Sequence, residues 1–457
     1  MTADLRPAYL SGGFAPVPDE ADAVDLDVSG HLPAELAGRY LRNGPNPLPG
    51  TDPGHNFAGQ GMLHGVRIVD GRATWYRNRW VRTPLADGAR PDRTDPLSAL
   101  TCTTANTSVI HHAGRILTLV ENGVPWEVTE DLDTVGPWDF HGKLRTAMTA
   151  HPKVDPATGD LYLFGVGLQP PHLTFHHVTA AGDLVRSTPI TVPRPTMMHD
   201  FAITENHVVW LDLPVVFDQG LRSRPGIPFR WSDAHGARIG VMPRDGGDAD
   251  VRWIDVEPGY AFHVANAKEA APGRIVVEAV RYTPATFDRI WTGLGGVSSP
   301  SAVVAGSGAN LYRWTLDVAA GTAGEEAVDD LDVEFPTIND DRTGLASDTV
   351  YAVTAPLMID DRNKPAIIKY DTVRGTRDTW VFDPSWIPGE AEFVPARGAT
   401  REDDGWLLSI VAHRTADAAS LVVLDASDVA AGPVATVHLP RRVPLGFHGG
   451  WIPDAGR

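Results

Sequence analysis

The chain repeats one local pattern along most of its length: a short apolar run, a turn, and a second short apolar run. Clear examples are GVRIVDGRATWYRNRWV at 65–81, TSVIHHAGRILTLVE at 107–121 and HPKVDPATGDLYLFGV at 151–166. The residues between the runs, Asp-Gly, Ala-Gly and Asp-Pro-Ala-Thr-Gly, are turn signals, so each segment is predicted to form a β-hairpin. The pattern returns at 199–214, 268–282, 401–414 and 420–440.

A series of hairpins without alternating strands and helices is typical of a barrel, a sandwich or a propeller. The 45 glycines and 38 prolines fit many short strands and tight turns. Length alone would suggest about three domains of roughly 150 residues, but closed all-β folds remain one domain at larger sizes. The 457 residues therefore favour a propeller. We expect one domain over 1–457, with 1–30 as an N-terminal extension.

Four histidines stand out because each lies at the end of a predicted strand: His151, His199, His263 and His448. The interval from His199 to His263 is close to one seventh of the chain, and the interval from His151 to His199 is somewhat shorter. The interval from His263 to His448 is close to three times one seventh of the chain. The histidines therefore recur at about the interval of one blade, as expected if inner strands of a propeller point histidines at its axis.

Neutral imidazole is the commonest protein ligand for iron, copper and zinc. A ligating histidine needs an acceptor for its other ring nitrogen, and this acceptor is often a carboxylate. Glu121, Glu334 and Glu390 lie among apolar neighbours, where a buried glutamate is costly unless it is paired. Taken singly, each of these residues also has an ordinary interpretation: a surface or core histidine, or a glutamate on the outer face of a strand.

The charge and the cysteine content narrow the partners and the compartment. The net charge of −19, with no run of Lys or Arg, argues against a nucleic acid partner. The single cysteine, Cys102, excludes an internal disulfide and fits a reducing compartment. The N-terminus lacks the features of a signal peptide, and no stretch reaches the ~18 apolar residues of a membrane span. We therefore expect a soluble cytoplasmic protein.

Ten segments, in order along the chain, resemble the carotenoid cleavage oxygenase family, which includes enzymes that cleave apocarotenoids, epoxycarotenoids and lignostilbenes. They cover nearly the whole chain from residue 38 onward. The segments are GRYLRNGPNP (38–47), GMLHGVRI (61–68), ANTSVI (105–110), AHPKVDPATGDLYLF (150–164), MMHDFAIT (197–204), PFRW with ARIGVMPR (228–231, 237–244), FHVANAKE (262–269), VEFPTIN (333–339), GEAEFVPAR with EDDGW (389–397, 402–406) and GFHGGWIP (446–453).

The resemblance implies a seven-bladed β-propeller with a loop-built dome over one axial Fe(II) per chain. The implied iron ligands, which are also the catalytic centre, are His151, His199, His263 and His448. The implied outer carboxylates are Glu121, Glu334 and Glu390, with Glu392 as the less favoured choice near Glu390. Thr107, in the family's Ala-Asn-Thr motif, is expected near an open coordination position.

The activity that this resemblance implies is a dioxygenase reaction. Molecular oxygen is inserted across a conjugated C=C bond, which yields two carbonyl products without a separate reductant. The branch of the family that cleaves stilbenes and phenylpropenes typically has a lysine just before the glutamate that matches Glu121, and a tyrosine upstream, which together hold a phenol oxygen. Here the lysine position is Val120, and no tyrosine lies between Tyr76 and Tyr162. The sequence therefore favours an apolar carotenoid or apocarotenoid substrate.

Three alternatives stay open at this point. The chain could be a stilbene- or phenylpropene-cleaving dioxygenase, a metal-binding propeller hydrolase, or a propeller without catalysis. A hydrolase with a calcium-like ion would favour oxygen ligands from Asp, Asn and Glu over histidines. The apolar loops at 215–231 and 284–300 leave open a transient contact with membranes, or simple packing over the propeller. The oligomeric state does not follow from the sequence.

Overall fold

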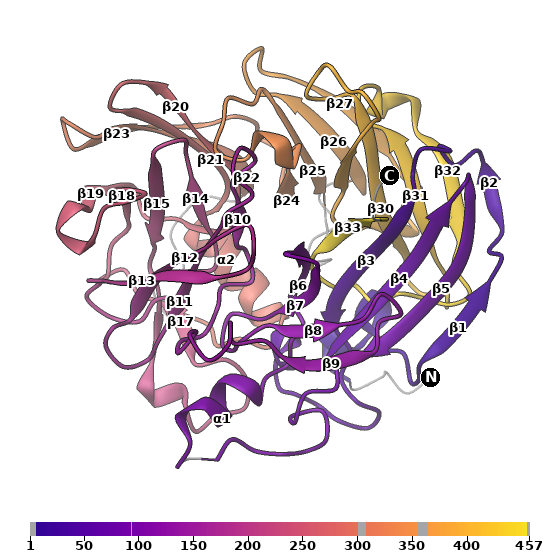
Figure 1. Ribbon diagram of the computed structural model, residues 1–457, viewed down its shortest axis with the longest axis horizontal. Helices are drawn as coiled ribbons and strands as arrows, with labels where there is room; N and C mark the ends of the chain where they lie inside the picture. Colours follow the sequence, from indigo (N-terminus) through magenta and orange to yellow (C-terminus); the bar gives the residue numbers. More distant parts are fainter. Residues whose placement is uncertain (1–5, 93, 300–307, 355–363, 455–457) are drawn as a thin grey trace.

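The strands of the chain surround a central axis (Figure 1). The computed structural model describes residues 6–92, 94–299, 308–354 and 364–454. Within these residues the strands form seven sheets of four to six strands and one separate two-stranded hairpin. Inner strands of several pairs of neighbouring sheets contact one another. The predicted seven-bladed β-propeller is thus confirmed.

The sheets follow the chain in order, with both chain ends in the first. That sheet contains β1 (Ala21–Val24), β5 (Arg72–Trp80), β4 (Gly61–Val69), β3 (Gly38–Pro45) and β33 (Gly449–Pro453). The next three sheets contain β6 (Ser108–His112), β7 (Arg115–Leu119), β8 (Trp126–Val128) and β9 (Thr134–Pro137); β10 (Lys153–Val154), β11 (Leu161–Val166), β12 (Leu173–Val178) and β13 (Leu184–Ile190); and β14 (Phe201–Ile203), β15 (His207–Asp212), β18 (Arg238–Pro243) and β19 (Arg252–Asp255).

The remaining sheets complete the ring. They contain β20 (Tyr260–Ala271), β21 (Arg274–Tyr282), β22 (Ala309–Asp317) and β23 (Thr322–Ala327); β24 (Val333–Thr337), β25 (Thr349–Thr354), β26 (Ala366–Asp371) and β27 (Thr376–Val381); and β28 (Trp386–Pro388), β29 (Glu392–Pro395), β30 (Gly405–His413), β31 (Ala419–Asp425), β32 (Pro433–His438) and β2 (Val28–Gly30). The separate hairpin contains β16 (Val215–Phe217) and β17 (Phe229–Trp231).

Turn chemistry explains how the predicted hairpins form. Between β4 and β5, Asp70 and Gly71 have φ angles of 50° and 71°. Between β6 and β7, Ala113 and Gly114 have φ angles of 49° and 75°. Two successive residues with positive φ match the right-handed twist of the flanking strands, which is the reason that Asp-Gly favours a tight hairpin.

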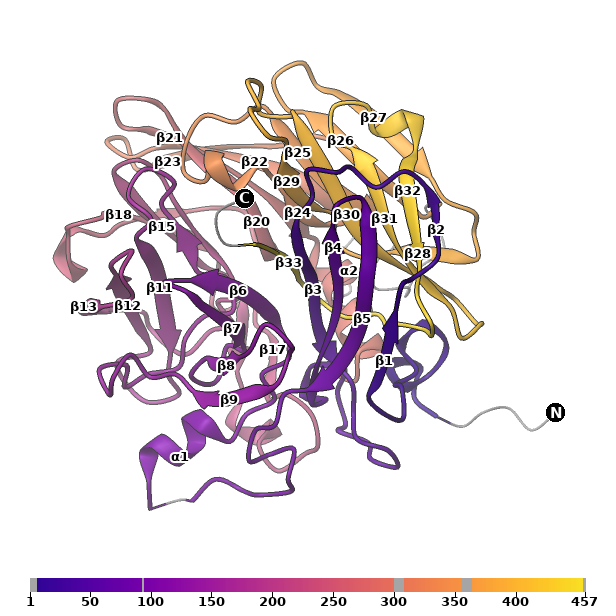
Figure 2. The same ribbon diagram turned by 45° about the vertical axis from the view of Figure 1, so that its right-hand side comes forward.

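Helices are few and short in the described residues. The α-helices are α1 (Pro96–Thr101) and α2 (Pro284–Gly293), and the 3₁₀ helices are η1 (Ala8–Leu10), η2 (Gly12–Phe14), η3 (Asn56–Ala58), η4 (Gln219–Leu221), η5 (Asp248–Asp250), η6 (Asp340–Arg342) and η7 (Val429–Ala431). Both α-helices start with a proline after a capping side chain, Asp95 or Thr283. Helix α1 lies at one end of the molecule, away from β24–β27 (Figures 1 and 2). None of these helices has the length and apolar character that crossing a bilayer requires.

The ring closes through both chain ends. The C-terminal strand β33 pairs with β3, so that Arg42 lies opposite Gly449. The N-terminal strand β2 pairs with β32 at the outer edge of the last sheet, and β1 pairs with β5. Part of the segment 1–30 is therefore built into two sheets. Apolar side chains fill the space between blades; the largest buried cluster includes Val241, Val277 and Ile368 from three different sheets.

Candidate metal centre

Four histidine side chains meet on the propeller axis. His151 and His199 lie two residues before β10 and β14, His263 lies in β20, and His448 directly precedes β33. One potential ligand nitrogen from each lies within 4.8 Å of the corresponding atoms of the other three. The long interval between His263 and His448 contains one complete sheet and all strands but β2 of the next, which explains why it is close to three blade lengths.

The three predicted glutamates come from the three blades that supply no histidine to this group. Glu121 follows β7, Glu334 lies in β24, and Glu390 lies between β28 and β29. Every blade thus contributes one residue to an arrangement of four imidazoles and three carboxylates.

Each carboxylate is paired with one imidazole through its Nδ1 atom. The Nδ1–Oε distance is 2.5 Å from His263 to Glu334 and 2.9 Å from His448 to Glu390, and His199 pairs in the same way with Glu121. A neutral imidazole that donates Nδ1–H carries its lone pair on Nε2. The carboxylates therefore set both the tautomer and the ring orientation of three histidines.

The facing nitrogen atoms suit a cation. The Nε2 atoms of His199 and His263 are 3.2 Å apart, and those of His151 and His199 are 2.9 Å apart. Metal–nitrogen bonds of about 2.1 Å place two neighbouring ligands about 3 Å apart. The lone pairs of His199 and His263 would repel at this separation unless a cation lay between them. An all-imidazole donor set fits iron, copper, nickel or zinc better than calcium or magnesium. The centre can therefore hold a transition-metal ion.

The protonation of the centre agrees with this interpretation. Burial, together with the other imidazoles and Lys153, lowers the pKa of His151 well below its usual value. Burial also lowers the pKa of His263, although Glu334 opposes this. Burial would raise the pKa of Glu334, but the contact with His263 and further hydrogen bonds outweigh it and lower this pKa. His151 and His263 are thus neutral, and Glu334 is ionised, at neutral pH.

His199 behaves differently from its neighbours. Burial alone would lower its pKa, but the charge of Glu121 and the hydrogen bond to it outweigh burial and raise it. The side chain of Glu121 is 24% exposed, compared with 3% for Glu334 and 9% for Glu390. The pair of His199 and Glu121 is therefore the most solvent-accessible of the three.

Local backbone irregularities aim these side chains inward. The pairing of β20 with β21 shifts register between Ala261 and Val264, at His263. The pairing of β24 with β25 shifts between Glu334 and Thr337, and Phe335 has a φ of 51°. This conformation is rare for a residue with a bulky side chain. It lets the Phe335 N–H donate to Glu334, and it accompanies a β-bulge of the kind that re-aims side chains beside active sites.

Thr107 and Val120 lie at the open end of the β6–β7 hairpin, beside the centre. Both are buried. The Thr107 N–H donates to the Leu119 carbonyl, and the Thr107 carbonyl accepts from the His448 N–H at 3.2 Å. The Thr107 hydroxyl donates to Asn106 Oδ1 at 3.2 Å. Thr107 is thus fixed next to a histidine of the centre, and its place near an open coordination position remains a prediction.

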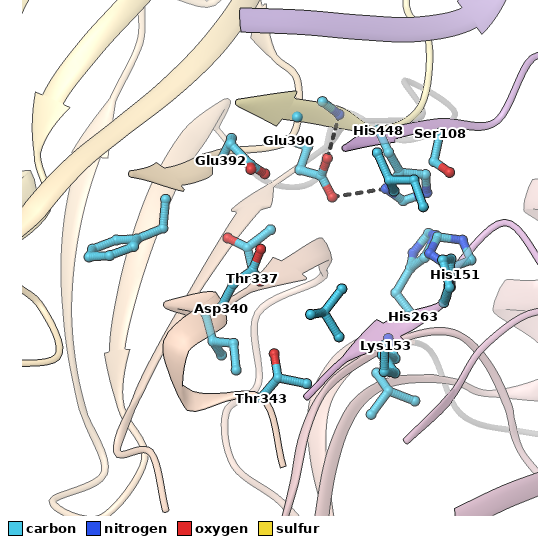
Figure 3. A pocket seen from close by; sticks show the side chains of 18 of the residues that line it. Ser108, His151, Lys153, His263, Thr337, Asp340, Thr343, Glu390, Glu392 and His448 are labelled. Carbon is cyan, nitrogen blue, oxygen red and sulfur yellow. Dashed lines mark hydrogen bonds and ion pairs between the residues drawn. The ribbon is translucent and has the colours of Figure 1, made fainter. Parts of the chain in front are cut away.

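A cavity of about 460 Å³ with a mixed polar and apolar lining reaches three of the four histidines, His151, His263 and His448 (Figure 3). Its other polar lining includes Lys153, Asp200, Asp340, Asp341, Glu390 and Glu392. Glu392 accepts a hydrogen bond from the Trp451 N–H at 3.3 Å, whereas Glu390 holds His448 and the Gly449 N–H. The structure thus places Glu390 against a histidine, as expected, and directs Glu392 elsewhere.

Aromatic side chains that the sequence did not single out pack against the centre. The ring of Phe335 lies 5.2 Å from the rings of both His263 and His448. Phe262 packs edge-on against His199 at 5.4 Å. Phe57 in turn contacts Phe262 at 6.1 Å. These neighbours depend on strand register and on packing between distant segments; the only sequence signal was the position of Phe262 and Phe335 directly beside His263 and Glu334.

Comparisons with known proteins agree with the geometry. The family model described as RPE65, retinal pigment epithelial membrane protein, matches residues 14–453. The chain is 39% identical to a carotenoid cleavage oxygenase of Mycobacterium tuberculosis, over 99% of each chain. It is 34% identical to a carotenoid 9,10(9',10')-cleavage dioxygenase of Arabidopsis thaliana, over 98% of this chain and 90% of that protein. It is 31% identical to an isoeugenol monooxygenase of Pseudomonas putida, over 98% and 99%.

Solved structures match over the same extent. The lignostilbene dioxygenase of Pseudomonas brassicacearum superposes with a TM-score of 0.85 at 29% identity, covering 98% of this chain and 99% of that one. The cobalt-substituted ACO of Synechocystis superposes with a TM-score of 0.82 at 28% identity, covering 98% of each chain.

Proposed function

The chain belongs to the family of carotenoid cleavage oxygenases, and we propose on this premise that it is a non-haem Fe(II) dioxygenase that cleaves a conjugated C=C bond of a carotenoid or apocarotenoid. The observation that carries this proposal is the convergence of four imidazoles, three of them oriented by a carboxylate. The assignment of the metal as iron, with one ion per chain, rests on this donor set together with the family.

His151, His199, His263 and His448 are the residues that would hold the iron. When bound, the ion supplies the chemistry that joins molecular oxygen to the alkene. The overall reaction is balanced without another reductant: the C=C bond and the O=O bond break, and two C=O bonds form. Four neutral ligands leave the charge of the divalent ion uncompensated. Glu121, Glu334 and Glu390 offset this charge from outside the ligand shell, because each holds an Nδ1–H and not the metal.

The protein's own part in this reaction is positional. The carboxylates keep each Nε2 lone pair directed at the centre, and the rings of Phe335 and Phe262 restrict water at its walls. Phe262, Phe57 and Phe447 form a cluster of contacting rings beside His199, an apolar environment of the kind that suits a hydrocarbon chain. Holding one double bond of such a chain beside the metal accounts for much of the rate enhancement expected from orientation.

The relatives divide between carotenoids and phenolic alkenes, which are a phenylpropene in one case and a stilbene in the other. The M. tuberculosis and A. thaliana proteins are named for carotenoid cleavage, whereas the two Pseudomonas proteins are named for isoeugenol and lignostilbene. Val120 supports the first group, because a buried valine offers no charge to a phenolate oxygen. The partners that we propose are therefore an apolar carotenoid-type molecule and O₂.

A metal analysis tests whether the four histidines bind iron, which the proposed function requires. Protein purified with iron available should contain one iron per chain, and His199→Ala or His263→Ala should lose it. A propeller hydrolase would instead be expected to contain calcium, and a non-catalytic propeller would need no metal. Finding calcium, or no metal in the wild type, would therefore refute the proposed function.

A further inference from the structure

Glu334 accepts more of the described hydrogen bonds than either of the other two carboxylates that pair with a histidine of the centre. Its Oε2 atom accepts from His263 Nδ1 at 2.5 Å and from the Phe335 N–H. Its Oε1 atom accepts from the hydroxyl of Tyr282 at 2.7 Å. By comparison, Glu390 accepts from His448 and from the Gly449 N–H. Among the hydrogen bonds described for these carboxylates, Tyr282 is the only side-chain donor other than a histidine of the centre.

Tyr282 reaches Glu334 from the same blade as His263. It is the last residue of β21, and it lies opposite Tyr260 in the β20–β21 hairpin that carries His263. Glu334 belongs to β24 of the next blade. One blade thus donates hydrogen bonds to both oxygens of a carboxylate in the next blade. The Tyr282 hydroxyl donates to Oε1 of Glu334, and His263 Nδ1 donates to Oε2.

These two hydrogen bonds fix the rotation of the Glu334 carboxylate. With Oε1 held by Tyr282, Oε2 stays directed at His263 Nδ1, and His263 in turn directs Nε2 at the centre. Tyr282 is fully buried and Glu334 is 3% exposed, so water has little access to replace the phenol. A buried acceptor that loses its donor retains the full cost of its removal from water.

We propose that Tyr282 is a positioning residue of the metal centre, which acts through Glu334 to hold His263 in its metal-binding orientation. The inference rests on the proposed function only in requiring a metal at the four histidines. Tyr282 has no described contact with the histidines themselves. Its effect should therefore appear in metal affinity and should depend on Glu334.

The direct test compares Tyr282→Phe with Tyr260→Phe. Tyr260 is a matched control, because it is also buried, lies opposite Tyr282 in the same hairpin, and donates its hydroxyl to the Met197 carbonyl at 2.7 Å. The affinity for Co²⁺ would be measured by competition with a chelator, after circular dichroism has shown equal folding. Loss of an outer hydrogen bond at a metal site typically weakens binding by about 10–100-fold. We expect roughly tenfold weaker binding for Tyr282→Phe and less than about twofold for Tyr260→Phe.

A double-mutant cycle with Glu334→Gln shows whether Tyr282 acts through that carboxylate. Tyr282→Phe should weaken Co²⁺ binding in the wild type and have less than about twofold effect in the Glu334→Gln background. Equal affinities of Tyr282→Phe and Tyr260→Phe, or an undiminished effect without Glu334, would overturn the inference. If the wild type itself failed to bind Co²⁺ or iron, the proposed function would fall first, so the two failures are distinguishable.

Discussion

Three histidines of the centre share one arrangement: a carboxylate holds Nδ1, and Nε2 is the atom left to bind a metal. His199, His263 and His448 obtain this carboxylate from a different blade in each case. The carboxylate fixes the metal-binding tautomer and the orientation of each ring without placing an anion on the metal. His151 differs from these three, because burial and the other imidazoles lower its pKa well below the usual value.

Val120 tests the substrate preference. Lysine at this buried position, beside Glu121, would add a donor for a phenolate oxygen. Val120→Lys should therefore raise kcat/KM for a hydroxystilbene by at least about tenfold, the equivalent of one modest charge-assisted hydrogen bond. Steady-state assays would measure this, with Val120→Met as the apolar control of similar length. Efficient cleavage of hydroxystilbenes by the native protein would show that the interpretation of Val120 is wrong.

The sequence could identify the residues that short motifs carry. All four histidines and the three glutamates were predicted, and the structure brings them together. Tyr282 and Phe335 were not, because their roles depend on features that no motif displays. The contact of Tyr282 with Glu334 crosses between blades, and the direction of Phe335 follows from a bulge with positive φ.

The side chain of Glu269 joins one blade to the next through hydrogen bonds. It lies near the end of β20 and accepts hydrogen bonds from Thr204, Asn206 and His207 in the β14–β15 turn. Burial alone would raise the pKa of Glu269, but these hydrogen bonds outweigh burial and lower the pKa to about 2. A depressed pKa means that folding favours the ionised carboxylate. This stabilisation is present above the unfolded-state pKa of about 4.5 and is lost as the pH falls towards 2.

Glu269→Gln should therefore destabilise the protein at pH 7, by about 1–2 kcal/mol after allowance for partial exposure. The difference from the wild type should shrink as the pH falls below about 4.5. Urea unfolding at a series of pH values would measure both effects. Glu205→Gln, in the same turn, is the control, because it removes the same charge from an exposed side chain. If the difference in the free energy of unfolding between Glu269→Gln and the wild type stayed constant down to about pH 3.5, the stabilising role of the ionised Glu269 would be wrong.

Hairpins were the most predictable elements, since apolar runs and Asp-Gly turns are local signals. The strands β1 and β2 were not predicted, and 1–30 was expected to be an extension. These strands are short, and β2 pairs with β32, which lies near the opposite end of the chain. Such pairing is decided by the closure of the whole ring and leaves little trace in the local sequence.

The complete ring depends on contacts that join distant parts of the chain. Strand β33 returns to β3, and the four histidines come from blades spread around the axis. A metal at the centre would therefore link four blades at once. Because the ligands converge only in the folded ring, a bound metal should stabilise the folded state.

Metal removal tests this coupling. At a free metal concentration about 100 times Kd, binding adds about 2.7 kcal/mol to the free energy of unfolding. For a chain of this length, this corresponds to about 3 °C in Tm. Calorimetry should show this shift between the metal-free and metal-loaded wild type, and none for His263→Ala. Equal shifts in both proteins would indicate that the metal binds elsewhere.

The proposed reaction splits one alkene into two carbonyls with both atoms of O₂. The most direct measurement incubates the iron-loaded protein with an apocarotenal under ¹⁸O₂, with rapid reduction of the products to alcohols before mass spectrometry. Rapid reduction prevents exchange of the carbonyl oxygen with water. We predict two products in equal amounts, each with one ¹⁸O, and none from His263→Ala. Label in only one product, or cleavage that persists in His263→Ala, would show that the proposed reaction is wrong.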